Sequence, residues 1–189
     1  MTKRGSFVDG QLEGSIRAQL RALGESLQAG DDSNLVVWVL EGVLACAQRP
    51  LRRHPTFGGR KPLPPDARNA VIEWVGRIVA MGFASIICLT HEKELKYYVP
   101  LRLHPDGLLG FYRASGLEVE HLGWPDPAHA DTLAERERRM ALVDRIRVEA
   151  SEAFERMPKP VLLHCSSGID RSPPVAAFIA GKHVSKGSG

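Results

Sequence analysis

The sequence predicts an α/β fold, a single domain whose central, mostly parallel sheet is flanked by helices on both faces. Short runs rich in β-branched residues alternate with longer amphipathic runs, which is the pattern of strands linked by crossover helices. A length of 189 residues suits one domain with a full core. Hydrophobic residues make up 43% of the chain and charged residues 25%, a composition that is typical of globular proteins and excludes a disordered or fibrous one.

The chain is predicted to divide into three segments. Residues 1–33 form an N-terminal helical segment, residues 34–184 form the main domain, and residues 185–189 form a flexible tail. In the first segment, apolar residues recur every three or four positions, at Leu12, Ile16, Leu20, Leu23 and Leu27. This spacing places them in one stripe along a helix, so we expect the first segment to be an amphipathic helix.

The main domain is predicted to alternate strands and helices. The strands are expected at residues 34–40, 43–47, 84–90, 117–122 and 160–164. The helices are expected at residues 66–81, capped by Asp66, and at residues 105–115, 131–157 and 172–180. Open α/β sheets bind ligands along the edge where their parallel strands end. We therefore expect the segments that follow strands 117–122 and 160–164 to meet at that edge.

The segment after the last predicted strand, His164–Ser172, has the most specific pattern in the chain. It reads HCSSGIDRS, so that Cys165 and Arg171 are separated by five residues with Gly168 among them. A strand, a tight loop and a helix in succession aim backbone N–H groups and a helix dipole at one anion. In that setting a cysteine is favoured as a thiolate, and an arginine can hold two oxygens of a phosphate. The segment therefore predicts a nucleophilic site that handles phosphate.

Each position of this loop has an expected role. The phosphate-binding residues are Ser166, Ser167, Gly168, Ile169, Asp170 and Arg171. Ser172 is expected to donate a hydrogen bond that stabilises the Cys165 thiolate, or to cap the following helix, and the two roles are compatible. His164 is expected to order the loop through hydrogen bonds rather than to act as a base.

A second motif, Trp124-Pro125-Asp126, follows the strand predicted at residues 117–122. With the Cys165–Arg171 loop it resembles the cysteine-based protein tyrosine phosphatase superfamily, and within it the small dual-specificity-like members. The order of the two motifs is that of the family, and a weaker likeness extends over about residues 34–180. The resemblance implies a phosphotyrosine-phosphatase-like fold and hydrolysis of phosphomonoesters through a phosphocysteine on Cys165, with Asp126 as general acid and then general base. It implies neither a cofactor nor a metal.

The resemblance leaves the substrate class open. The substrate is a phosphorylated protein or, with the same chemistry, a phosphoinositide or an RNA 5′-phosphate. An acidic residue at Asp170 occurs in lipid-phosphatase-like relatives, whereas the neutral loop residues and the run Ile169–Pro173 are closer to the dual-specificity pattern. A non-catalytic phosphate-binding scaffold is the alternative from another class of protein.

Basic residues gather between Glu41 and Asp66, where no acidic residue occurs. They are Arg49, Arg52, Arg53, Arg60 and Lys61. The run is interpreted either as a solvated loop or as a basic border of the active site that attracts phosphorylated substrates.

The composition also bears on compartment and partners. The N-terminus lacks the apolar run of a secretory signal, and no stretch reaches the roughly 18 apolar residues of a membrane span. The three cysteines form no disulfide framework, and a net charge of +3 does not indicate nucleic acid. We therefore expect a cytoplasmic protein with no membrane span and no nucleic-acid partner.

Two further expectations concern Cys88 and the C-terminal end. Cys88 is expected on a strand beside that of Cys165, where it is either an ordinary buried thiol or, as in some relatives, the partner of a reversible disulfide. Relatives usually continue with one or two helices after the region of Arg171. Either the chain is a shortened form, or the N-terminal helix covers the corresponding surface.

Overall fold

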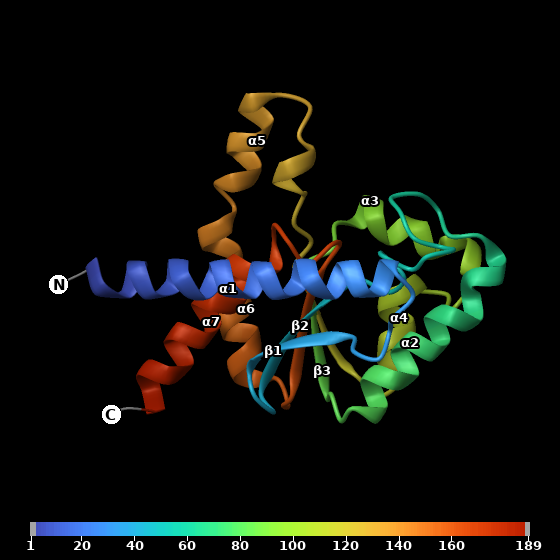
Figure 1. The fold of residues 1–189 in the computed structure, drawn as a ribbon, viewed down its shortest axis with the longest axis horizontal. Helices are drawn as coiled ribbons and strands as arrows, with labels where there is room; N and C mark the ends of the chain where they lie inside the picture. The colour runs from blue at the N-terminus through green and yellow to red at the C-terminus, as the bar shows by residue number, and fades with distance from the viewer. Residues whose placement is uncertain (1–2, 188–189) are drawn as a thin grey trace.

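The computed structural model describes residues 3–187, which form an α/β domain around one five-stranded sheet (Figure 1). The strands are β1 (Val36–Leu40), β2 (Leu44–Gln48), β3 (Ser85–Cys88), β4 (Glu118–His121) and β5 (Val161–Cys165), in the order β1-β2-β5-β3-β4. β1 is antiparallel to β2, and all other neighbours are parallel. The predicted fold class, a mostly parallel sheet in one α/β domain, is confirmed.

Helices cover both faces of this sheet. They are α1 (Lys3–Gln28), α2 (Arg68–Ala80), α3 (Glu92–Leu95), α4 (Gly107–Ala114), α5 (Leu133–Met140), α6 (Val143–Arg156) and α7 (Ser172–Gly187), with the 3₁₀ turns η1 (Pro65–Ala67), η2 (Lys96–Leu101) and η3 (Pro127–His129). α1, α6 and α7 share one apolar core with Leu163 and Cys165, whereas α2, α4 and η2 share another with Leu162. Successive residues of β5 therefore face opposite cores, as the pleat of a strand requires.

The N-terminal helix α1 lies along α7 and belongs to the same core (Figure 1). Its residues Ile16 and Leu20 are 1% and 0% exposed. The predicted stripe is therefore confirmed in its central part, and α1 covers surface next to the C-terminal helix. α7 itself runs through residues 185–187, where the sequence predicts a tail, and residues 188–189 lie outside the described residues.

The single helix predicted over residues 131–157 is wrong, because the structure divides it into α5 and α6. The indole Nε1 of Trp124 donates to the carbonyl of Arg139 at 2.8 Å. The same carbonyl accepts from Leu142 at 3.3 Å, a distance of three residues along the chain rather than four. α5 then projects away from the sheet (Figure 1), and none of its residues is buried.

Two other local expectations need correction. Asp66 does not cap α2, because it lies within η1, and α2 begins after Ala67 without a side-chain cap. α3 and η2 are not among the elements predicted from the sequence. The start of α3 has a capping box, in which His91 accepts from the backbone of Lys93 and Glu94 bonds the backbone of His91. This box follows directly after β3, and it positions Glu94 at the carboxyl edge of the sheet.

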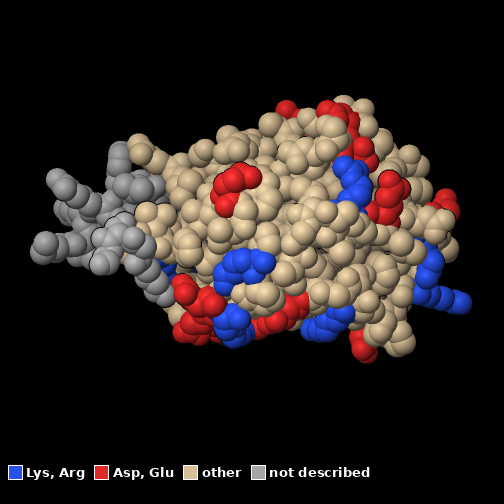
Figure 2. All heavy atoms as spheres, turned by 90° about the horizontal axis from the view of Figure 1, so that it is seen from below, with Lys and Arg blue, Asp and Glu red and all other residues tan. Residues whose placement is uncertain are grey.

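The face seen in Figure 2 lies at the end of the molecule where the parallel strands begin. Acidic and basic side chains are scattered over it, and no large area of one sign is visible. Within residues 3–187, no helix has both the length and the apolar character required to cross a membrane. The specific polar groups lie instead at the opposite edge, where the parallel strands end.

Candidate active site

The two sequence motifs meet at the carboxyl edge of the sheet. β5 ends at Cys165, and the loop that follows it leads into α7 at Ser172. The segment after β4 carries Asp126 to the same place, where its Oδ2 lies 3.6 Å from Nη2 of Arg171. Residues far apart in the sequence therefore share one site, as the parallel topology predicts.

Arg171 is fixed in this site by a buried ion pair. It is 1% exposed, and its two terminal nitrogens bond the carboxylate of Glu94 at 2.7 and 3.1 Å. Nη1 also donates to the carbonyl of Trp124 at 2.8 Å. Burial alone would raise the pKa of Glu94, but the hydrogen bonds and charge of Arg171 outweigh it and lower that pKa to about 2. The guanidinium is thus held in one orientation before any ligand binds.

Glu94 is a site residue that sequence reasoning missed. It is buried, and it lies 77 positions from its partner along the chain. Burial alone would lower the pKa of Arg171, but the neighbouring Cys165 and Glu94 raise it, so the guanidinium stays charged. An acidic residue soon after the end of a central strand was the available signal, because such residues lie at the ligand-binding edge.

Two buried donors beside Cys165 have no partner among the described residues. They are Nε of Arg171 and the hydroxyl of Ser172. Across the same part of the chain, the backbone N–H groups of residues 167–170 donate no hydrogen bond. A buried donor without an acceptor costs about 1–3 kcal/mol, so native proteins rarely retain several in one place unless they bind something. The loop is therefore a concentrated set of donors suited to an anion.

The loop is held from outside by α1 and by residue Arg49. Arg17 of α1 donates to the carbonyl of Ile169 at 3.0 Å. Arg49 bonds Ser166 twice, from its backbone N–H to the carbonyl at 3.0 Å and from Nε to the hydroxyl at 3.2 Å. Gly168 has a φ of +79°, and a Cβ there would lie 3.3 Å from Leu20 of α1. Glycine is therefore required both by the turn and by the close approach of the helix.

His164 lies on the other face of the sheet from Cys165. It is 0% exposed, and its Nε2 is 3.3 Å from the hydroxyl of Tyr112. Its Nδ1 lies 3.3 Å from the carbonyl of Cys165. Burial lowers the pKa of His164 to about 4, so the ring is neutral near pH 7. A neutral ring within hydrogen-bonding distance of these groups can order the end of β5, whereas it is poorly placed to accept protons from a substrate.

Asp126 directly precedes η3 in the segment between β4 and α5, and it is 7% exposed. It caps η3 by accepting from the backbone of Ala128 at 3.0 Å. Its Oδ2 contacts Arg60 at 3.3 Å and His129 at 3.0 Å, in addition to Arg171. Its carboxylate is thus held at the site from three directions.

The predicted basic run does not act as one surface. Arg60 reaches Asp126, which agrees with a border of the active site. Arg49 is buried, and it bonds Ser166, the hydroxyl of Tyr98 and the carbonyl of Gly59. Arg52 and Arg53 line a different cavity. The run therefore contains a site residue, a structural residue and a separate basic pair.

The cysteines are all free thiols, and the sheet separates Cys88 from Cys165. β3 neighbours β5 as expected, but Cys88 pairs in register with His164 and packs in the core opposite to that of Cys165. Burial raises the pKa of Cys88 to about 11. A disulfide to Cys165 would require one side chain to cross the sheet, so the structure favours the ordinary buried thiol.

A cleft of about 780 Å³ opens beside Asp126. It is lined on one side by Arg60 and Tyr97 and on the other by residues of α5. Among the described residues, no group of His, Cys, Asp and Glu side chains is arranged to hold a metal ion.

Comparisons with models of protein families, with curated proteins and with solved structures gave no match.

Proposed function

We propose that this chain is a cysteine-dependent phosphatase that hydrolyses phosphomonoesters. The observation that supports this most is the set of buried donors without partners, Nε of Arg171 and the hydroxyl of Ser172, beside the thiol of Cys165. A thiol nucleophile, a fixed guanidinium and free backbone N–H groups are the parts required to bind a phosphoryl group and transfer it.

In the first step, the Cys165 thiolate attacks phosphorus, so that an S–P bond forms as the ester P–O bond breaks. Arg171 and the N–H groups of residues 167–170 hold the negative charge on the other phosphoryl oxygens. Asp126 gives its proton to the leaving oxygen, because its carboxyl group lies at the same edge as Arg171.

In the second step, Asp126 takes a proton from water, which attacks phosphorus and breaks the S–P bond. Inorganic phosphate leaves, and the Cys165 thiolate is restored. Ser172 donates its hydroxyl hydrogen bond to the departing sulfur, which stabilises the thiolate.

We propose phosphorylated proteins as the substrates, in a reducing compartment such as the cytoplasm. The cleft beside Asp126 combines cations, among them Arg60, Lys93 and Arg138, with the acidic residues Glu94, Asp131 and Glu135. Because acidic and basic side chains balance in this lining, it lacks the excess positive charge that would favour phosphoinositides or RNA 5′-phosphates over a single phosphorylated side chain. Tyr97 adds an aromatic surface for such a side chain.

The first test is hydrolysis of para-nitrophenyl phosphate in the presence of EDTA. Wild type is expected to be active, and Cys165→Ser is expected to lose turnover while it still binds the phosphate analogue tungstate. Cys46→Ala is the matched control, because Cys46 is a buried thiol of the same core to which no catalytic role is assigned. Turnover in Cys165→Ser close to wild type would exclude the phosphocysteine route. Tungstate binding by a folded but inactive wild type would favour a phosphate-binding scaffold.

The second test concerns the proposed general acid. Asp126→Asn is expected to lower kcat by about 10²–10⁴ for a substrate whose leaving group needs a proton, such as phenyl phosphate. The effect should be smaller for para-nitrophenyl phosphate, whose leaving group is stable as an anion. Equal losses for the two substrates would assign Asp126 a positioning role rather than proton transfer.

A further inference from the structure

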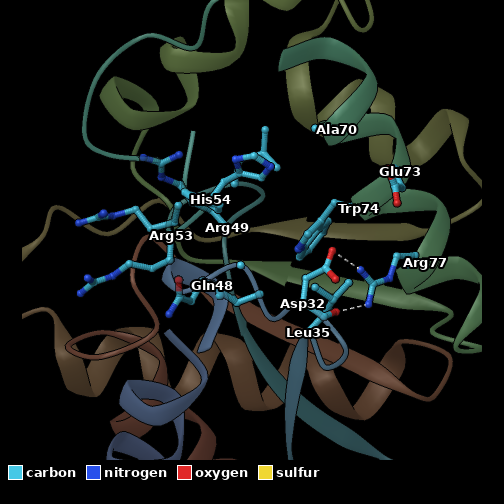
Figure 3. A pocket seen from close by; sticks show the side chains of 15 residues that line it. Asp32, Leu35, Gln48, Arg49, Arg53, His54, Ala70, Glu73, Trp74 and Arg77 are labelled. Atoms are coloured by element: carbon cyan, nitrogen blue, oxygen red, sulfur yellow. Dashed lines mark hydrogen bonds and ion pairs between the residues drawn. The ribbon is translucent and has the colours of Figure 1, made fainter. Parts of the chain in front are cut away.

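A second cavity, of about 130 Å³, lies between the end of α1, the end of β2, the loop after it and α2. Leu35, Leu51 and Trp74 give it apolar walls, and Gln48, Arg52 and Arg53 give it polar ones. Figure 3 shows Gln48, Arg53 and His54 on one side of Trp74, with Asp32, Arg77 and Glu73 on the other. The cavity therefore has an apolar middle and a basic side.

The basic side contains buried polar atoms without partners in the described chain. They are Oε1 of Gln48 and the Nε atoms of Arg52 and Arg53. Gln48 is only 3% exposed, and its amide nitrogen donates to the carbonyl of Leu20. These atoms supply two donors and one acceptor, and each is costly to leave without a partner.

Arg52 also has no acidic side chain in direct contact with it among the described residues. No ion pair or hydrogen bond of its side chain is found among the described residues, whereas Arg53 bonds Gln28 at 2.7 Å. Burial lowers the pKa of Arg52, and the neighbouring charges of Arg49 and Arg53 lower it further, which outweighs the opposing effect of Glu94. A partly buried cation among other cations is stabilised when an anion binds beside it.

The acidic residues of the lining do not meet this need. Asp32 is paired with Arg77, whose Nη1 lies 2.9 Å from its Oδ2. Glu73 is exposed on α2, on the far side of Trp74 from Arg53 (Figure 3). The charge of Arg52 is therefore left for a ligand.

We propose that this cavity binds a small aromatic carboxylate or phosphate, with its ring between Trp74 and the two leucines and its anion on Arg52 and Arg53. The volume of about 130 Å³ is close to that of an apolar cavity of about 150 Å³ that accepts one benzene ring, so it suits the ring of the ligand, while the anion lies at the basic side. Arginine is suited to both anions, since its planar fork matches carboxylate and phosphate oxygens. A hydroxyl or amino group on the ligand would donate to Oε1 of Gln48.

The ligand would also act on the loop from Cys165 to Arg171, called the phosphate loop below. This step rests on the proposed phosphatase function. Gln48 pairs in register with Cys165 across β2 and β5. Arg49, which lines the cavity as well, bonds both the backbone and the side chain of Ser166. A ligand that shifts residues 48–49 would therefore change turnover without touching the substrate.

The test is calorimetric titration with three matched probes, namely benzoate, its neutral isostere benzamide, and acetate. Benzoate is expected to bind at least about tenfold more tightly than the other two, because only it combines a ring with an anion. Arg52→Gln should weaken benzoate binding by about ten- to a hundredfold, the usual range for a hydrogen bond to a charged group. Equal binding of benzoate and benzamide would overturn the proposal.

A second variant tests the place of binding without removing a charge. Ala70→Phe puts a large side chain into the lining, and it should abolish benzoate binding while inorganic phosphate still binds. Arg145→Gln is the control, because Arg145 is exposed on α6 and is absent from the cavity. Undiminished benzoate binding in either Arg52→Gln or Ala70→Phe would contradict the site, whatever the activity of the protein.

The effect on turnover is measured separately with para-nitrophenyl phosphate. Benzoate is expected to change kcat in wild type, and Arg52→Gln should remove that change. Competitive inhibition that persists in Arg52→Gln would place benzoate in the phosphate loop and overturn the coupling. Binding at the cavity in a protein without turnover would instead retain the site and reject the proposed function.

Discussion

Arg171 and Arg52 are both withdrawn from water, but only Arg171 has an acidic partner. Both terminal nitrogens of Arg171 bond Glu94, and only its Nε is left without a partner. Arg52 is partly buried near Arg49 and Arg53 with no ion pair in the described chain. A paired arginine keeps its position before a ligand arrives, whereas an unpaired one gains its counter-charge from the ligand. The comparison indicates a preorganised phosphate loop beside a cavity that responds to occupancy.

Of the changes that compare the two arginines, the largest effect is expected from changing Arg171. Arg171→Lys keeps the charge but loses Nε and the planar fork, so we expect kcat/KM for para-nitrophenyl phosphate to fall by about 10²–10³. Arg145→Lys, on the exposed surface of α6, is the matched control and should keep wild-type turnover. A loss of less than about tenfold in Arg171→Lys would mean that charge alone is sufficient and that the fork is not used.

The arginine of the loop was predictable from sequence, whereas its pairing with Glu94 was not. The spacing of Cys165, Gly168 and Arg171 is local, and a strand, a loop and a helix place those residues together in any such fold. Glu94 meets Arg171 only because β3 and β5 are neighbours in the sheet. Strand order is set by the packing of the whole domain, so no spacing of residues in the sequence predicts the pair of Glu94 and Arg171.

The same limit explains the wrong helix at residues 131–157. The local pattern is amphipathic throughout, and it contains no glycine or proline that would mark a break. The break comes from Trp124, whose indole bonds the carbonyl of Arg139 from outside the helix. The break between α5 and α6 affects the site, because the side chain of Arg139 donates to the carbonyls of Asp126 and His129. The position of the break and the position of Asp126 therefore depend on each other.

An effect on stability separates the two arginines directly. Glu94→Gln removes the carboxylate that bonds both terminal nitrogens of Arg171 and leaves this buried charge only the longer contact with Asp126, at 3.6 Å. The loss should lower the free energy of unfolding by about 3–5 kcal/mol near pH 7. Arg52→Gln breaks no ion pair, so the free energy of unfolding should not fall. Glu149→Gln is the control for the loss of an exposed pair, that of Glu149 with Arg145, and should change stability by no more than about 1 kcal/mol.

The loss of stability predicted for Glu94→Gln should depend on pH in one direction. Burial opposes the shift, but the contacts with Arg171 lower the pKa of Glu94 from its ordinary value of 4.5 to about 2. A carboxyl group whose pKa is lowered on folding stabilises the native state fully above its ordinary pKa, and this contribution is lost as the pH falls toward the lowered value. Urea unfolding at several pH values should therefore show a full difference between wild type and Glu94→Gln near pH 7, and a difference that shrinks from about pH 4.5 to about pH 2. A difference that stays constant over this range would assign the loss to altered packing, and the pairing of Arg171 would then not distinguish it from Arg52.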